Sequence, residues 1–328
     1  MVLAGRRLVL VAALVLIWAS AAGAGWAQAA QADAAWKLEF DVASVKQNKS
    51  NVPQRSNFSL DNGNVYSTVE RGAVFGPNGG YFSAVNQPLW RYISFAYDLS
   101  GTQELAMRFS YFTGLTSKVP EWVTGGFESS AERFDIEARA AGTPTKNQMR
   151  AMMRSLLEER FKLAAHLETR EAPVFALVLV KPEKLGPRLR PHPEDGSCAA
   201  AGSDDEAAKK TVTADGYPTA CGVIAHLPPG GPGRSSFGGR DVPLALFATS
   251  LPTQTGMATV SRPVIDRTGL SGKFDLSLEW VGEYNPPPDA SGPTFAEAMK
   301  EQLGLKLEAA KGPIEVLVID HVEQPSLN

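Results

Sequence analysis

Two stretches of the chain, 155 residues apart, repeat one another without a gap, and this repeat limits the fold more than any other feature. Residues 81–97 read YFSAVNQPLWRYISFAY, and residues 236–252 read SFGGRDVPLALFATSLP. They share an aromatic, a proline and a leucine position: Phe82/Phe237, Pro88/Pro243 and Leu89/Leu244. Asn86 and Asp241 stand two residues before the proline, where we expect each to cap a helix. Each stretch therefore predicts a short strand followed by an amphipathic helix.

A second repeat lies further along each half, at an offset of 140 residues. RFDIEARA at 133–140 matches KFDLSLEW at 273–280, and apolar and polar residues alternate in both, as in a half-buried strand. Each strand opens with the same two residues, Phe134-Asp135 and Phe274-Asp275. Because the aspartate recurs in both copies, we interpret it as structural, either bonding a backbone N–H or pairing with the nearby Arg133 or Lys273.

A helix is predicted after each of these strands. The first opens with Thr145 and Gln148 and the second with Thr294 and Glu297, and both pairs fit the Thr-x-x-Glu/Gln capping box. The first helix carries an apolar stripe at helical spacing, made of Met149, Met152, Met153, Leu156 and Leu157. We interpret this stripe as core packing, because methionine clusters at this spacing are typical of a buried helix face.

Both halves end alike. HLETREAPVFALVLVK at 166–181 matches KLEAAKGPIEVLVIDH at 306–321 without a gap. Pro173 and Pro313 divide each stretch into two apolar runs. This pattern predicts a terminal hairpin in each half, with the proline at a strand start, where no ladder hydrogen bond is lost.

Together the repeats predict an α+β fold, built by tandem duplication of a strand-helix-strand-helix-hairpin unit. We place the first unit at 37–185, where it includes an additional N-terminal strand, LEFDVASVK. The second unit covers 234–325. Residues 186–233 are dense in proline and glycine and hold both cysteines, so we interpret them as a linker or long loop.

The charge balance excludes one class of partner. The chain carries a net charge of −3, and removing residues 1–29, which hold two arginines and no acid, lowers it to −5. A nucleic-acid-binding protein normally has a basic surplus, so we expect no nucleic-acid partner. With 44% hydrophobic and 20% charged residues, the chain has the composition of a globular protein.

Residues 1–29 have the layout of a secretory signal peptide: a short cationic start, an apolar run at 8–18 and small residues at the end. Cleavage is expected after Ala24, Ala29 or Ala32. The apolar run is about half of the roughly 20 residues that span a bilayer, and no later segment is longer. We therefore expect an exported protein, periplasmic or extracellular, with no membrane span after the signal peptide is removed.

The two cysteines, Cys198 and Cys221, are predicted to form a disulfide, because an oxidising compartment favours one. His192 and His226 flank the pair, so a Cys2His2 zinc site is the alternative. Their spacing matches no established zinc pattern, and we predict neither a metal nor a cofactor.

Two aspartates are weak catalytic candidates. Asp266 opens Asp-Arg-Thr-Gly, which differs by one residue from the phosphorylated Asp-Lys-Thr-Gly of P-type ATPases. It stands ahead of Thr268 and Gly269, where an Asx turn is the ordinary explanation. Asp275 is the second candidate, and the two together could serve as a general acid and base.

Several stretches resemble a family of exported proteins of unknown function found largely in soil Acidobacteria. They are FDVASVKQNKS, RFDIEARA, MRSLLEERFKLAAHLETREAPVFALVLVK, VIDRTGLSGKFDLSLEW and EQLGLKLEAAKGPIEVLVIDHVEQPS. Similar domains occur behind membrane metallopeptidases of the beta-lactam-sensor type, which implies a sensing role outside the cytoplasm. The chain has no His-Glu-x-x-His, so the resemblance does not imply peptidase activity.

The second unit also resembles the short N-terminal domain of secretins and TonB-dependent transducers. The stretches that carry this likeness are FGGRDVPLALFATSLPTQTGMATV, DRTGLSGKFDLSLEW and TFAEAMKEQLGLKLEAAKGPIEVLVI. Domains of that family bind other proteins and are not catalysts. We therefore expect an exported, non-catalytic protein that recognises an extracytoplasmic protein or ligand. The alternative is a secreted hydrolase with a carboxylate-based site between the two units.

Overall fold

The structure is a computed structural model that describes residues 38–58, 60, 79–109, 119–125, 131–194, 212–256, 259–282 and 287–325. Residues Glu39–Asn328 form one compact unit, and it contains both helices and sheets, which confirms the α+β class. The predicted signal peptide lies outside the described residues, and the boundaries at 185 and 233 stay predictions. In the part of the chain that is described, no helix is both long and apolar enough to cross a membrane.

The first sheet is antiparallel and has one buried face. Its strands lie in the order β1 (Val42–Asn48), β4 (Arg133–Arg139), β3 (Tyr81–Pro88) and β2 (Arg55–Ser56). The predicted alternation holds in β4, where Phe134 and Ile136 are fully buried and Glu137 and Arg139 are exposed. The first sheet therefore turns one face to a core and the other to solvent.

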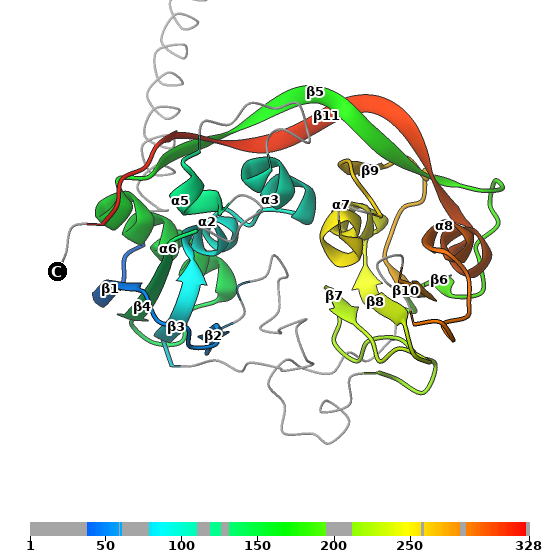
Figure 1. Cartoon of the computed structure of the whole chain (residues 1–328), viewed down its shortest axis with the longest axis horizontal. Helices are drawn as coiled ribbons and strands as arrows, with labels where there is room; N and C mark the ends of the chain where they lie inside the picture. Colours follow the sequence, from blue (N-terminus) through cyan, green and yellow to red (C-terminus); the bar gives the residue numbers. More distant parts are fainter. Residues whose placement is uncertain are drawn as a thin grey trace, which may run out of the picture. The chain divides into compact units, whose positions relative to one another are not determined.

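Among the described residues, the helices that accompany this sheet are α2 (Leu89–Ala96), α3 (Gly101–Arg108), α5 (Glu121–Thr124) and α6 (Lys146–Phe161). Thr145 and Gln148 form the predicted capping box at the start of α6. The methionine stripe of α6 is buried and packs with Phe134 in the first core, as predicted. Figure 1 shows these elements in blue to green.

The second sheet has a comparable plan. Its strands lie in the order β6 (Leu189–Pro191), β10 (Phe274–Val281), β8 (Arg234–Val242) and β7 (Val223–His226), with α7 (Leu244–Thr255), α8 (Phe295–Ala298) and the π-helical turn η2 (Met299–Leu303). Strands β6 and β7 fall in the stretch interpreted as a linker, so that interpretation is wrong for these residues. They join the sheet because Leu189 and Val223 are buried apolar side chains within the polar stretch.

The predicted terminal hairpins are wrong. Each stretch instead forms one uninterrupted strand, β5 (Ala164–Leu179) and β11 (Leu305–His321), and the two pair with each other as an antiparallel ribbon. A short strand, β9 (Val264–Asp266), pairs in parallel with β5 on its other side. Figure 1 shows β5 and β11 side by side along their length. The prediction that both stretches form paired strands was right, but each stretch pairs with the stretch in the other half of the chain.

The prolines sit in the ribbon without costing a ladder hydrogen bond. Phe175 N donates to Pro263 O, and Leu177 O accepts from Arg267 N, so these two residues of β5 face β9. Every second residue of a strand turns its backbone groups to the same side, so the nitrogen of Pro173 also points away from β11. Pro313 lies opposite Glu171, and the same alternation turns its nitrogen away from β5.

The ribbon links two hydrophobic cores. Ala172 lies opposite Gly312 at its centre, Leu167 opposite Leu317 on one side and Leu177 opposite Leu307 on the other. Leu177, from the first half of the chain, belongs to the second core. Leu317, from the second half, belongs to the first core. Strand β5 therefore follows a helix of the first core and completes the second core. Strand β11 follows a helix of the second core and completes the first.

Glycine at position 312 permits a close approach of β9 to the ribbon centre. A Cβ atom there would stand 2.7 Å from Ile265 Cδ1 and 3.2 Å from Arg267 Nη2. The Arg267 guanidinium uses this space and donates a hydrogen bond of 3.0 Å to the carbonyl oxygen of Lys311. Arg267, the arginine of Asp-Arg-Thr-Gly, therefore forms a hydrogen bond with the backbone at the middle of the ribbon.

The residues expected to cap α2 and α7 have another position. Pro88 and Pro243 are the N-cap residues and offer no capping side chain. Asn86 and Asp241 lie in the left-handed region, with φ of 57° and 53°, where the strand register is irregular. Proline takes the extended position directly before the helix, and asparagine and aspartate tolerate positive φ better than most residues.

The buried Tyr92 of α2 gives a pH-dependent prediction. Its hydroxyl donates to Phe134 O at 3.0 Å, and burial, followed by the charge of Asp135, raises its pKa well above the usual value. Because the folded-state pKa is the raised one, this stabilisation is complete below the unfolded-state pKa of about 10 and is lost as the pH rises through the folded-state pKa.

We expect Tyr92→Phe to lower the free energy of unfolding by about 1 kcal/mol at pH 7, because one buried hydrogen bond is lost. At pH 11 the difference from wild type should shrink, since phenylalanine has no proton to lose. Urea unfolding at both pH values measures the effect, with Tyr81→Phe at an exposed position as the control. The second repeat carries phenylalanine, Phe247, at the position that matches Tyr92, so the substitution introduces a residue that the chain already uses there. An equal difference at both pH values would contradict the prediction.

Candidate functional site around Asp275

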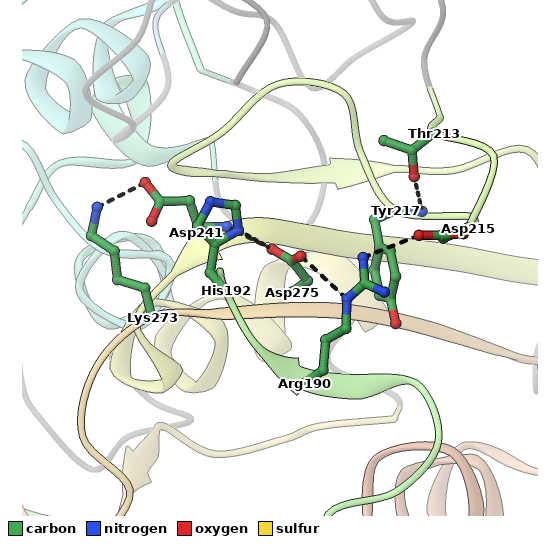
Figure 2. Close-up of polar contacts among 8 residues, drawn as sticks. All are labelled: Arg190, His192, Thr213, Asp215, Tyr217, Asp241, Lys273 and Asp275. Carbon is green, nitrogen blue, oxygen red and sulfur yellow. Dashed lines mark hydrogen bonds and ion pairs between the residues drawn. The ribbon is translucent and has the colours of Figure 1, made fainter. Parts of the chain in front are cut away.

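Asp275 is the most deeply buried carboxylate that the sequence singled out. It lies in β10, the second strand of its sheet, and its side chain is 1% exposed. Three groups from two segments surround it: Asp241 N at 3.2 Å, His192 Nδ1 at 2.6 Å and Arg190 Nε at 3.4 Å (Figure 2). A buried carboxylate needs partners of this kind, because an isolated buried charge is strongly unfavourable.

The edge strand β6 and the residue that follows it supply both side-chain partners, Arg190 and His192. Arg190 lies directly opposite Asp275 in the strand register, and His192 N donates to Lys273 O at 2.8 Å, which continues the pairing. Residues two apart on a strand point to the same face. Arg190 and His192 therefore reach the same side of the sheet, and both meet the carboxylate there.

A loop packs against Arg190. The guanidinium lies over the ring of Tyr217, 4.4 Å from its centroid, and Nη2 bonds Asp215 Oδ2 at 3.2 Å. Thr213 shapes the loop, since Thr213 N donates to Tyr217 O at 2.7 Å and Thr213 Oγ1 accepts from Tyr217 N at 3.1 Å. Burial raises the pKa of Tyr217, while the charge of Arg190 acts in the opposite direction. We call residues 212–218 the covering loop.

A salt bridge borders this group. Lys273 Nζ lies 2.7 Å from Asp241 Oδ2 (Figure 2). The side chain of Asp241 thus pairs outward with a lysine, while its backbone N–H is bonded inward to Asp275. The two contacts together hold the residue in its left-handed conformation.

The first sheet has a matching arrangement around Asp135. Its Oδ1 accepts from Asn86 N at 2.7 Å and from Asn48 Nδ2 at 2.8 Å. Asn86 has a positive φ like Asp241, and Lys46 lies opposite Asp135 in the register as Arg190 lies opposite Asp275. Asparagine therefore makes, in the first sheet, the contact that histidine makes in the second.

His192 is the group in this cluster with acid–base capacity. With Nδ1 directed at Asp275, a neutral imidazole donates from Nδ1 and leaves Nε2 as the proton acceptor or metal ligand. The His192 side chain is 8% exposed, so few solvent molecules reach it. No three His, Cys, Asp or Glu side chains within the described ranges are placed to hold a metal ion.

The second predicted acid, Asp266, lies elsewhere. It ends β9 in the ribbon sheet, and its Oδ1 accepts from Thr268 N at 2.9 Å and from Thr268 Oγ1 at 2.8 Å. This is an Asx turn, closed by glycine at position 269 with φ of 72°. Asp266 and Asp275 are therefore held in different sheets, each by its own hydrogen bonds.

The cysteine predictions stay open. Cys198 lies outside the described residues, so the disulfide with Cys221 remains a prediction. The alternative Cys2His2 site depends on the same residue. His192 is bonded to Asp275, and His226 ends β7.

Arg190, Asp215 and Tyr217 are functional candidates that the sequence reasoning missed. One signal was present in GPRLRPHP, where Arg188, Arg190 and His192 alternate with other residues as on one face of a strand. The prolines on either side of this short run obscured it, because they favour a loop interpretation.

A family model described as a protein of unknown function, DUF3738, matches residues 91–322, which is more than half of the chain. Comparisons with curated proteins and with solved structures found no match.

Proposed function

This chain belongs to the DUF3738 family of proteins of unknown function, and we propose that it is an exported, non-catalytic protein that recognises an extracytoplasmic protein or ligand. The signal-peptide layout at 1–29 supports export to the periplasm or beyond. The resemblance to soil acidobacterial exported proteins, and to secretin and TonB short N-terminal domains, supports recognition as the role.

One observation carries the non-catalytic part of this proposal. The buried Asp275 is engaged by three donors, and Asp135 is held in the same way at the matching place in the first sheet. A site that performs chemistry would need only one copy, whereas a contact that stabilises a strand irregularity is useful in both sheets. The Asx turn of Asp266 occupies that carboxylate as well.

The same observations support the tandem duplication. The central aspartate, the positive-φ residue and the edge-strand partner recur in both sheets. The ribbon register also pairs Ala172 with Gly312, which are the residues that precede Pro173 and Pro313 in the two repeats. A ribbon that is centred on equivalent residues follows naturally if two copies of one unit exchanged their terminal strands.

The recognition role is tested with the chain from residue 30 onward, immobilised and exposed to periplasmic and secreted fractions of the producing cells. We expect a specific component to be retained and to be eluted by free protein. A chain that stays monomeric and retains nothing, while its circular dichroism shows it to be folded, would overturn the proposal.

The pair His192–Asp275 favours a second function, that of a secreted hydrolase with His192 as general base. His192→Asn separates the two functions, because asparagine makes the equivalent contact at Asn48. If the histidine is structural, we expect His192→Asn to unfold within about 1 kcal/mol of wild type and to keep its partner.

Activity screens on peptides, glycans and esters complete this test. A hydrolase would lose at least a hundredfold in rate in His192→Asn while the urea midpoint stays within error. Asp266→Asn serves as the comparison, because it changes a carboxylate that is remote from His192. Wild-type activity that survives His192→Asn would rule out the general-base role.

A further inference from the structure

The two sheets differ in how their outward faces are covered. On the second sheet, Asp275 and Ser277 of β10 are 1% and 7% exposed although they point away from the core. Pro218, at the end of the covering loop, lies so near β8 that a Cβ on Gly238 would stand 3.3 Å from its Cδ atom. The outward face of the second sheet is therefore buried by the chain itself.

The outward face of the first sheet is exposed. Val42, Arg139 and Tyr81 lie side by side across β1, β4 and β3. Val42 is 71% and Tyr81 36% exposed, and the Arg139 guanidinium lies 5.5 Å from the centroid of the Tyr81 ring. Two large apolar side chains exposed in one row, with a cation between them, are typical of an interaction surface.

The length of one connection explains the difference. The chain passes from β6 to β7 through residues 192–222, and these include the covering loop. The corresponding passage from β1 to β2 consists of residues 49–54. Six residues are too few to cross a sheet face and return, because an extended chain spans at most about 3.5 Å per residue.

We propose that the outward face of the first sheet binds a peptide turn that carries a carboxylate two residues before a tyrosine. The covering loop is the template. In that loop Asp215 pairs with Arg190, and the Arg190 guanidinium stacks on the Tyr217 ring. Lys46 stands in the first sheet where Arg190 stands in the second, and it is exposed. Lys46 has no carboxylate partner among the described residues.

Charge and shape agree with this occupant. The strands β1 and β4 present three cations, Lys46, Arg133 and Arg139, against two acids, Asp135 and Glu137. The cations exceed the acids by one, which favours an incoming carboxylate, and Asp135 is held by neutral donors of Asn48 and Asn86. The exposed Val42 and Tyr81 provide the apolar contact for a tyrosine ring.

This inference rests on the proposed recognition function and specifies its surface and ligand. A fluorescent peptide with the sequence of residues 211–220, TVTADGYPTA, is the probe, and the chain from residue 30 onward is the receptor. The control peptide has alanine in place of both the aspartate and the tyrosine. We expect anisotropy to show saturable binding of the probe, at least tenfold tighter than the control peptide, and weaker in high salt.

Receptor variants locate the site. Lys46→Glu and Arg139→Ala should each weaken binding at least tenfold, and hydrogen exchange should show protection gained in β1 and β4. Lys311→Ala, which changes an exposed lysine on β11, should leave binding unchanged. No binding at millimolar peptide, or binding that Lys46→Glu and Arg139→Ala leave intact, would overturn the proposal.

The same variants separate this proposal from the function on which it rests. If Lys46→Glu retains the cellular component as well as wild type does, the recognition function stands and the assigned face is wrong. If neither protein retains a component, the recognition function itself fails.

Discussion

Asp275→Ala is expected to lower the free energy of unfolding by about 3–5 kcal/mol, because removing one partner of a buried charged group leaves the others without compensation. The variant leaves Asp241 N–H, His192 and Arg190 facing a cavity on the buried outward face of the second sheet. Urea unfolding followed by the fluorescence of Trp280, which is buried in the second core, measures the loss.

Asp275→Asn and Asp135→Ala are the matched controls. The amide keeps the shape and one acceptor oxygen, so Asp275→Asn should cost about 1–3 kcal/mol. Asp135 is only half-buried and has two donors, so Asp135→Ala should cost about 1–2 kcal/mol. If Asp275→Ala costs no more than Asp135→Ala, the cluster around Asp275 is not the support for the second sheet that its geometry indicates.

Leu317→Ala is expected to destabilise the protein by about 2–5 kcal/mol, the usual range for deleting a buried leucine side chain. Leu317 is 3% exposed and packs in the first core, although it lies near the end of the second half of the chain. Hydrogen exchange should therefore accelerate most in α6 and β4, more than 150 residues earlier in the sequence.

Leu177→Ala is the reciprocal variant. This side chain is fully buried in the second core, so exchange should accelerate in β10 and α7. Leu167→Ala serves as the control, since Leu167 is 46% exposed in the same ribbon and should cost less than about 1 kcal/mol. If each substitution instead accelerates hydrogen exchange in its own half of the chain, the result would contradict the contribution of each strand to the opposite core.

Much of the local structure could be predicted from the sequence, because it depends on local physics. Alternating apolar residues identified β4 and β10, and the capping boxes at Thr145 and Thr294 marked the starts of α6 and α8. The caps expected at Asn86 and Asp241 failed because the N-cap positions are Pro88 and Pro243, two residues further on.

The ribbon could not be predicted in the same way. A strand that folds back on itself and a strand that pairs with a distant copy have the same alternation and tolerate a proline at the same positions. Only the distance between the two cores decides which pairing forms, and no local signal carries that distance. The hairpin interpretation of 166–181 and 306–321 therefore had the right strands and the wrong partners.

Only part of the site around Asp275 could be predicted from the sequence. A recurring aspartate after a recurring phenylalanine marked Asp275, but its partners come from a segment whose prolines and glycines favour a loop. Tyr217 acquires its role through burial and Arg190 through its contact with the Tyr217 ring, and both depend on how the covering loop returns to the sheet. Such long-range burial is not encoded in the spacing of neighbouring residues.

The exchanged strands also govern when this chain can fold. Leu317 belongs to the first core, so that core lacks one of its residues until residue 317 has been synthesised. Contacts of such long sequence separation form late and slowly. The architecture thus delays completion of the first core until the second half of the chain has been synthesised.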